Sequence, residues 1–140
     1  MRAAAAAVGL AAALGACVPA TRLDVPPDPR IRLLVNEPVG DFLADARIAS
    51  LLAEGCPDVA MTQELFNALV ITRETGRAAG TRFDPRSAGR DAAAASAQRY
   101  HDLRTRYGRD PFRGSTCAIV AAETEAGSPA TAFLSPVIGS

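Results

Sequence analysis

The three cysteines of this 140-residue chain constrain its fold more than any other feature of the sequence. Cys17 lies near the N-terminus, whereas Cys56 and Cys117 lie far apart in the body of the chain. An odd number of cysteines in an exported chain needs an explanation, because one thiol is then left without a partner inside the chain. The residues around Cys17 supply that explanation.

Residues 1–16 have the parts of a secretory signal peptide. Arg2 forms a short positive region, residues 3–14 are uncharged and rich in alanine, and small residues follow. The alanine-rich run is shorter and less apolar than the stretch of about 20 residues that a transmembrane helix needs. We therefore expect residues 1–16 to be a cleaved signal peptide.

The segment Leu14-Gly15-Ala16-Cys17 is similar to the lipobox of bacterial lipoproteins. In such segments the cysteine thiol accepts a diacylglycerol, and cleavage then makes that cysteine the first residue of the mature chain. The pattern predicts lipidation of Cys17; the alternative is an ordinary signal peptide, cut for example after Ala20. Val18 follows the cysteine where an aspartate would signal inner-membrane retention. The expected location is therefore the outer membrane, with the domain facing the periplasm.

Lipidation of Cys17 leaves Cys56 and Cys117, which have only one possible pairing. Disulfides form and persist in oxidising compartments such as the periplasm. This bond would staple the first and last thirds of the domain, and closing a loop of about 60 residues contributes roughly 4 kcal/mol. The alternatives are two buried free thiols or a redox pair. A redox pair is disfavoured because the two cysteines are not neighbours, as they are in C-x-x-C motifs.

Residues 17–40 are predicted to be the lipidated cysteine and a tether. The tether contains the helix-breaking residues Pro19, Pro26, Pro27, Pro29 and Pro38, which favour an extended backbone. The apolar run at 31–35 interrupts it and is expected to dock onto the domain as an edge strand or a helical turn.

Residues 41–134 are predicted to form an all-α domain, a small bundle of about four to five helices stapled by one disulfide. The first helix is expected to begin with Asp41 as its N-cap and to end at Gly55. Cys56-Pro57-Asp58 is expected to open the second helix, whose wide apolar stripe indicates a central, buried position.

The second half of the domain is also predicted to be helical. A short helix near 84–87 is expected to stop at Gly89, and a longer one spans 91–107 with an apolar stripe from Ala93 to Tyr107. A last helix is expected over 115–126, followed by one more turn to Leu134 and a tail at 135–140. Alternation typical of β-strands is not evident over more than six residues.

Motifs for catalysis or for cofactor binding are absent from the sequence. His101 is the only histidine, and neither a second histidine nor a spare cysteine is present to complete a zinc site. The chain has no G-x-S-x-G elbow and no glycine-rich phosphate loop. We therefore expect no metal and no cofactor, and a non-enzymatic role is favoured over an enzymatic one.

The distribution of charge is more informative than the net charge, which is zero and gives no overall attraction to nucleic acid. Residues 73–113 hold ten arginines and five acids, whereas residues 17–64 hold four arginines and eight acids. The favoured interpretation is internal pairing across packed helices, with solvated pairs such as Arg99–Asp102 and Asp102–Arg106. The alternative is a cationic face that binds anionic lipid, an anionic envelope polymer or an acidic protein. The candidate anion-binding residues are Arg82, Arg86, Arg99, Arg106 and Arg109.

Two motifs also resemble a known family. Gly55-Cys56-Pro57, a long helical middle and Cys117-x5-Glu123-x3-Gly127-Ser128-x4-Phe133-Leu134 are similar to small secreted alphaproteobacterial proteins of unknown function. The resemblance covers about residues 41–134 and implies a helical domain with a disulfide, but it implies no activity. The lipobox and the proline-rich tether are not part of the family pattern.

Taken together, these features predict a lipid-anchored envelope protein whose helical domain binds or supports another envelope component. The expected contacts are the membrane, through the lipid, and another envelope protein or an anionic envelope polymer. A small envelope enzyme, with a site that its sequence does not reveal, is the alternative.

Overall fold

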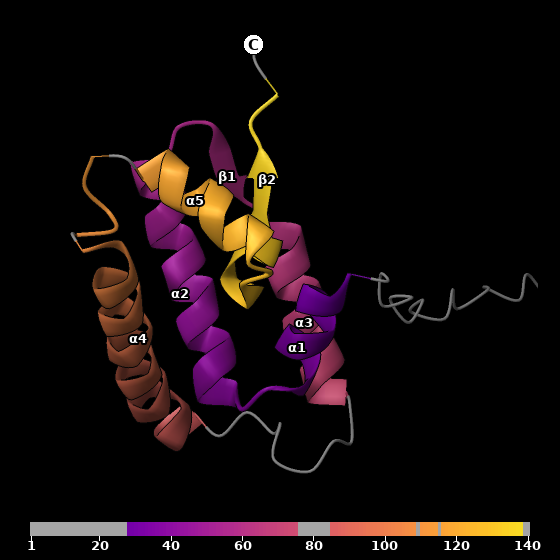
Figure 1. The fold of residues 1–140 in the computed structure, drawn as a ribbon. Helices are drawn as coiled ribbons and strands as arrows, with labels where there is room; N and C mark the ends of the chain where they lie inside the picture. Colours follow the sequence, from indigo (N-terminus) through magenta and orange to yellow (C-terminus); the bar gives the residue numbers. More distant parts are fainter. Residues whose placement is uncertain (1–27, 76–84, 109, 115, 139–140) are drawn as a thin grey trace, which may run out of the picture.

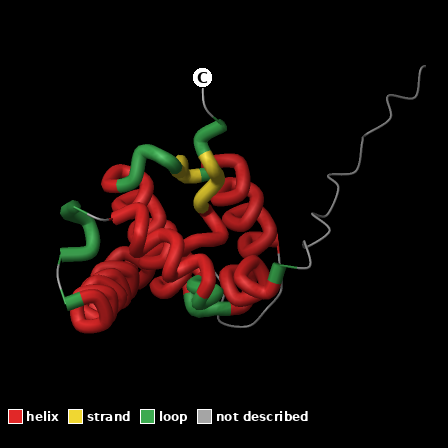
Figure 2. The backbone as a smooth tube through the Cα atoms, turned by 45° about the horizontal axis from the view of Figure 1, so that its top comes forward, coloured by secondary structure: helices red, strands yellow, loops and turns green. Residues whose placement is uncertain are grey.

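The computed structural model describes residues 28–75, 85–108, 110–114 and 116–138. Within these ranges the all-α bundle predicted from the sequence is confirmed, together with a small sheet that was not predicted (Figures 1 and 2). The elements are α1 (Pro29–Asn36), α2 (Val39–Gly55), β1 (Val59–Met61), α3 (Gln63–Thr75), α4 (Pro85–Tyr107), α5 (Thr116–Glu125), the 3-10 helix η1 (Pro129–Phe133) and β2 (Leu134–Pro136). No helix in the described ranges is long and apolar enough to cross a membrane.

The central helix of the bundle is α2. In Figure 1, α4 lies along one side of α2, α1 and α3 lie on the other side, and α5 crosses near its C-terminal end. The prediction that the second helix occupies the centre was therefore wrong. The helix at 63–75 is mostly half-buried, whereas α2 buries side chains on two of its faces.

Two apolar clusters on different faces of α2 form the core. The first is shared with α1, α3 and η1, and consists of Ile31, Leu34, Phe42, Ala46, Ala49, Leu69 and Phe133. The second is shared with α4, α5, η1 and the residue after α2, and consists of Ile48, Leu52, Cys56, Leu103, Ile119, Val120 and Ala130. In the first cluster the ring of Phe42 stacks on that of Phe66, with centroids 5.6 Å apart. α2 contributes to both clusters because its apolar residues lie on two faces of the helix, Phe42, Ala46 and Ala49 on one and Ile48 and Leu52 on the other.

Residues 28–40 belong to the folded domain, which corrects the predicted boundary between tether and domain at residues 40 and 41. Oδ1 of Asp28 accepts a hydrogen bond from the backbone N–H of Arg30 at 2.9 Å and so caps α1. Pro29 occupies the first turn, where a proline costs no hydrogen bond. The expected docking of the apolar run at 31–35 is confirmed as a helix, in which Ile31 and Leu34 are buried.

The two-stranded sheet explains another wrong prediction, that Cys56-Pro57-Asp58 opens a helix. β1 pairs antiparallel with β2, with Val59 opposite Pro136 and Met61 opposite Leu134. The backbone N–H of Val137 also donates to the carbonyl of Asp58 at 2.9 Å, so residues 135–137 belong to the fold and are not a free tail. A partner more than 70 residues away in the sequence holds this segment extended, and local helical periodicity cannot reveal such a partner.

Two predicted helix boundaries are also corrected. α2 begins at Val39 with Pro38 as its N-cap, so Asp41 lies in the first turn, where a carboxylate still complements the helix dipole. α4 runs through Gly89 without a break. A glycine inside a helix costs only about 1 kcal/mol, which a helix of 23 residues tolerates. Asp84, the predicted cap of this helix, lies outside the described residues.

The predicted helix ends at Gly108 and Gly127 are confirmed. Gly127 has φ +73°, and the N–H of Ser128 donates to the carbonyl of Glu123 at 3.0 Å. This left-handed glycine with its backward hydrogen bond is a Schellman cap. It turns the chain from α5 into η1 and places Ser128 beside the end of the helix.

Candidate functional site

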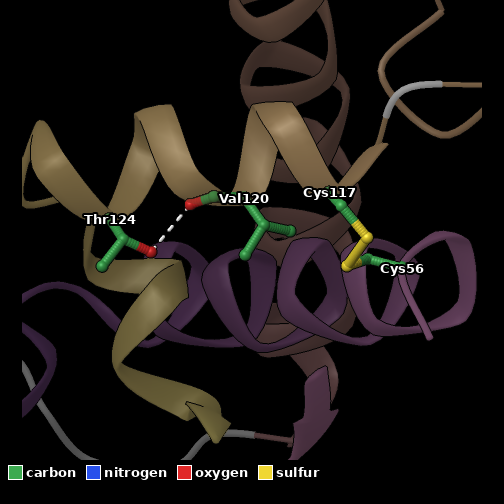
Figure 3. Close-up of a disulfide and its surroundings, with 4 residues drawn as sticks. All are labelled: Cys56, Cys117, Val120 and Thr124. Atoms are coloured by element: carbon green, nitrogen blue, oxygen red, sulfur yellow. Dashed lines mark hydrogen bonds between the residues drawn. A yellow bond between two sulfur atoms is a disulfide. The ribbon is translucent and has the colours of Figure 1, made fainter. Parts of the chain in front are cut away.

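The Cys56–Cys117 disulfide predicted from the sequence is confirmed (Figure 3). Cys56 directly follows α2, and Cys117 lies in the first turn of α5, with their Cα atoms 4.8 Å apart. The two helices can approach so closely because residue 55 is glycine. A Cβ atom at Gly55 would lie 2.7 Å from Oγ1 of Thr116. The bond therefore fastens a glycine-dependent contact between the end of α2 and the start of α5.

Asp58 lies close to this disulfide. One carboxylate oxygen of Asp58 and the two sulfur atoms all lie within 4.8 Å of one another, the only such group of three candidate ligand residues among the described residues. Metal ions prefer cysteine sulfur as thiolate. Since the two sulfurs are bonded to each other, this group offers no thiolate ligand in the oxidised chain.

A polar pocket lies between α2, α4 and the end of α5. Its volume is about 480 Å³. It is lined by Asp45, Ile48, Arg99, Asp102, Leu103, Arg106, Glu123, Ala126, Gly127, Ser128, Pro129 and Ala130. Five of these side chains are ionisable, and they come from three helices that are distant in the sequence. This pocket is the candidate functional site.

One wall of the pocket is an ion pair between α4 and α2. Nε of Arg99 donates to Oδ1 of Asp45 at 3.0 Å, and Nη2 donates to Oδ2 of Asp45 at 3.3 Å. Nη2 also reaches Oδ1 of Asp41 at 3.4 Å. Asp45 is only 1% exposed. The hydrogen bonds to Asp45 raise the pKa of the Arg99 guanidinium, despite its partial burial.

Glu37, in the link between α1 and α2, is a third carboxyl group near Asp45 and Arg99, although it does not line the pocket. Burial, the charge of Asp45 and a hydrogen bond with Asp45 together raise the pKa of Glu37 to about 8, against the opposing effect of Arg99. Glu37 is therefore largely protonated at neutral pH. Its Oε1 atom is sealed from solvent and has no hydrogen-bond partner.

Arg73 of α3 contacts the backbone of Glu37 and of the end of α1. Its guanidinium is 2% exposed and caps the C-terminal end of α1 by donating to the backbone carbonyls of Leu34, Val35 and Glu37. It also lies 4.7 Å from the centroid of the Phe42 ring. Carbonyl acceptors and the face of an aromatic ring compensate for the burial of this charge.

The opposite wall of the pocket is built around Glu123 of α5. Oε1 of Glu123 accepts hydrogen bonds from the hydroxyl of Tyr107, at 2.7 Å, and from Nη1 of Arg106. Glu123 is 4% exposed, although the Arg106 side chain is half-exposed. Burial and the bond to Glu123 raise the pKa of Tyr107. The pocket therefore lies between two buried carboxylates, each held by an arginine of α4.

Of the five candidate anion-binding arginines, the structure describes the side chains of two, Arg99 and Arg106. Arg99 and Arg106 line the same pocket, as expected from residues two helical turns apart. Both are paired with carboxylates inside the domain, which is the internal pairing that was favoured. Arg82 and Arg109 lie outside the described residues, and the side chain of Arg86, in the first turn of α4, is not described. Anion binding by this set stays a prediction.

The two expected solvated pairs, Arg99–Asp102 and Asp102–Arg106, do not form. Oδ1 of Asp102 instead accepts a hydrogen bond from Nε2 of Gln98 at 2.7 Å. Both arginines turn to the carboxylates of α2 and α5, because those are buried and offer a charged acceptor shielded from water. His101 is exposed.

A second groove lies between α2 and α4, with a volume of about 460 Å³. Ala93, Ala97 and Tyr100, predicted to be a packed stripe, line this groove. The residues of α4 that are buried against the bundle are Ala88 and Leu103. The ring of Tyr100 lies 5.4 Å from that of Phe112, and both residues line the groove.

Sequence reasoning missed Asp45 and Glu123 as residues of a site, although a signal was present. Asp45 lies three residues after Phe42, and Glu123 three residues after Val120, so both acids share a face with apolar residues. A carboxylate on an apolar face must be paired when it is buried.

Comparison with protein families, with curated proteins and with solved structures finds no match to this chain. The resemblance to small secreted alphaproteobacterial proteins stays a prediction.

Proposed function

We propose that this chain is an exported lipoprotein of the bacterial envelope, anchored by a lipid on Cys17. The observation that carries the proposal is the Cys56–Cys117 disulfide. It accounts for two of the three cysteines and is typical of an oxidising compartment. The cysteine that remains is the one that follows Leu14-Gly15-Ala16, where a lipobox places its acceptor.

The folded domain would stay close to the membrane surface. Residues 18–27 separate Cys17 from Asp28, the N-cap of α1. Ten residues span at most about 35 Å when fully extended. The domain would therefore face the periplasm next to its membrane, which we propose to be the outer one.

We propose that the domain is a non-enzymatic module that binds or supports another envelope component. Arg99 and Arg106 already hold the buried carboxylates of the pocket in ion pairs, so both carboxylates have a partner inside the domain. Glu37 has a pKa that would suit acid–base chemistry, but its Oε1 atom is sealed from solvent. These features favour binding over the alternative, a small envelope enzyme.

Membrane partitioning of the full chain tests the anchor. The wild-type chain and a Cys17→Ser variant are expressed in a Gram-negative bacterium and separated by detergent phase partitioning. We expect the wild type in the detergent phase and the variant in the aqueous phase, because a serine cannot form the thioether to diacylglycerol. The matched control is Cys56→Ser with Cys117→Ser, which should stay in the detergent phase. Equal partitioning of wild type and Cys17→Ser would contradict the proposal.

A further inference from the structure

Glu123 has a second carboxylate oxygen that the domain does not use. Both hydrogen bonds to this side chain, from Tyr107 and Arg106, go to Oε1, and none of the described residues donates to Oε2. The side chain is 5% exposed, and Oε2 is not among the atoms that are sealed from solvent without a partner. Oε2 therefore keeps some exposure and lacks a donor among the described residues, and the residue that carries it lines the pocket.

The charges around this oxygen favour a positively charged ligand. The pocket is lined by three acids, Asp45, Asp102 and Glu123, and by two arginines, so its formal balance is −1. Both arginines are already paired with carboxylates, and among the described residues Asp102 accepts only one hydrogen bond, from a neutral amide. The C-terminal end of α5 also faces the pocket, at Ala126 and Gly127, and a helix carries partial negative charge at that end.

The rest of the lining suits an apolar stem. Ile48, Leu103, Ala126, Pro129 and Ala130 supply hydrocarbon surface beside the charged groups. The volume of about 480 Å³ falls within the range of about 300–1,000 Å³ that is usual for small-molecule sites. A site with a few oriented polar groups on an apolar surface selects ligands by charge and length.

We infer that this pocket binds a small organic cation, an ammonium or guanidinium group on a short hydrocarbon stem. The cationic head donates hydrogen bonds to Oε2 of Glu123 and to the carboxylate of Asp102, and the stem lies on the apolar lining. The inference rests on the binding role proposed above and names its ligand class. It does not depend on the lipid anchor, which the N-terminal residue tests separately.

Titration of the purified full chain with cadaverine tests this inference, with binding measured by calorimetry. Glutarate, which has the same number of carbons and two negative charges, is the matched ligand control. We expect cadaverine to bind and glutarate not to bind. Saturable binding of glutarate alone, or no binding of cadaverine at concentrations up to about 10 mM, would overturn the inference.

Two substitutions then separate a local contact from a general charge effect. Asp102→Asn should weaken cadaverine binding about fivefold or more, since it removes a charge-assisted hydrogen bond. Glu125→Gln removes the same charge from an exposed residue of α5 outside the pocket lining, and it should leave binding within about twofold. Equal weakening by the two variants would overturn the inference. The hydrogen bond of Asp102, from Gln98, stays within α4, so the Asp102→Asn variant should keep the fold, which circular dichroism verifies.

Discussion

Arg99 and Asp45 join α4 to α2 by two hydrogen bonds, Nε to Oδ1 at 3.0 Å and Nη2 to Oδ2 at 3.3 Å. The two partners differ in exposure, because the side chain of Asp45 is 2% exposed and that of Arg99 is 36% exposed. Removal of the arginine would therefore leave a buried carboxylate without its partner. The pair matters to stability through this asymmetry more than through its own attraction.

Arg99→Gln should lower the free energy of unfolding by about 2–3 kcal/mol, somewhat less than for a fully buried pair because the arginine is partly exposed. Arg113→Gln is the control, since Arg113 pairs with Asp110 at 3.6 Å on the surface. Its effect should be below about 1 kcal/mol. Urea denaturation measures both variants, and equal losses would show that the Asp45 pair has no special role.

Replacement of Cys56 and Cys117 by serine should lower the free energy of unfolding by about 4 kcal/mol, because the bond closes a loop across 61 residues. The chain with Cys17→Ser provides a direct assay of the bond itself. Unfolded without reductant, it should contain no thiol that reacts with an alkylating agent. Two reactive thiols per chain would contradict the disulfide.

Gly55→Ala should destabilise the domain by about 1–3 kcal/mol, because the new Cβ atom would overlap Thr116 where α2 meets α5. Gly89→Ala is the matched substitution in a helix, and no atom lies within 4 Å of the Cβ position there. It should stabilise the domain by about 0.5–1 kcal/mol through helix propensity. Thermal unfolding distinguishes the two, and shifts of the same sign would show that Gly55 is not needed for close approach.

The raised pKa of Glu37 predicts how stability depends on pH. Its pKa is about 8 in the folded chain and near 4.5 when exposed, so between these values the folded state binds more protons than the unfolded state. Stability from this group therefore falls as pH rises from about 4.5 to 8, and levels off above that. Burial is the largest cause of the raised pKa, Asp45 and Asp41 add to it, and Arg99 opposes it.

Glu37→Gln should remove this contribution, since a glutamine stays neutral over the whole range. The melting temperature should fall less between pH 5 and pH 8 for the variant than for the wild type. Glu54→Gln, at an exposed position near the end of α2, controls for the loss of one acid. Parallel pH profiles for wild type and Glu37→Gln would show that Glu37 titrates normally.

Local sequence signals predicted the helical class, the disulfide and the helix ends at Gly108 and Gly127. These features depend on neighbouring residues, such as helical spacing and glycine φ angles, or on the count of cysteines. The short sheet could not be predicted in this way. Three-residue strands have too few residues to show alternation, and β1 is held by pairing with β2 near the other end of the chain.

For a similar reason, the arginines of the pocket could be predicted from the sequence but their carboxylate partners could not. The spacing of Arg99 and Arg106 placed both on one side of a helix, and the structure agrees. Their partners Asp45 and Glu123 come from helices that meet α4 only in the folded domain. An opposite-charge pair across helices has no fixed spacing in the sequence, so the ratio of arginines to acids indicated pairing but not the partners.

The N-terminal residue of the mature protein tests the central proposal most directly. Native protein is purified from bacterial membranes, and its N-terminal peptide is analysed by mass spectrometry. We predict a peptide that begins at Cys17 and carries the mass of a diacylglycerol, because cleavage before the cysteine keeps it in the mature chain. An unmodified peptide that begins at Val18, at Thr21 or further along would contradict the lipid anchor.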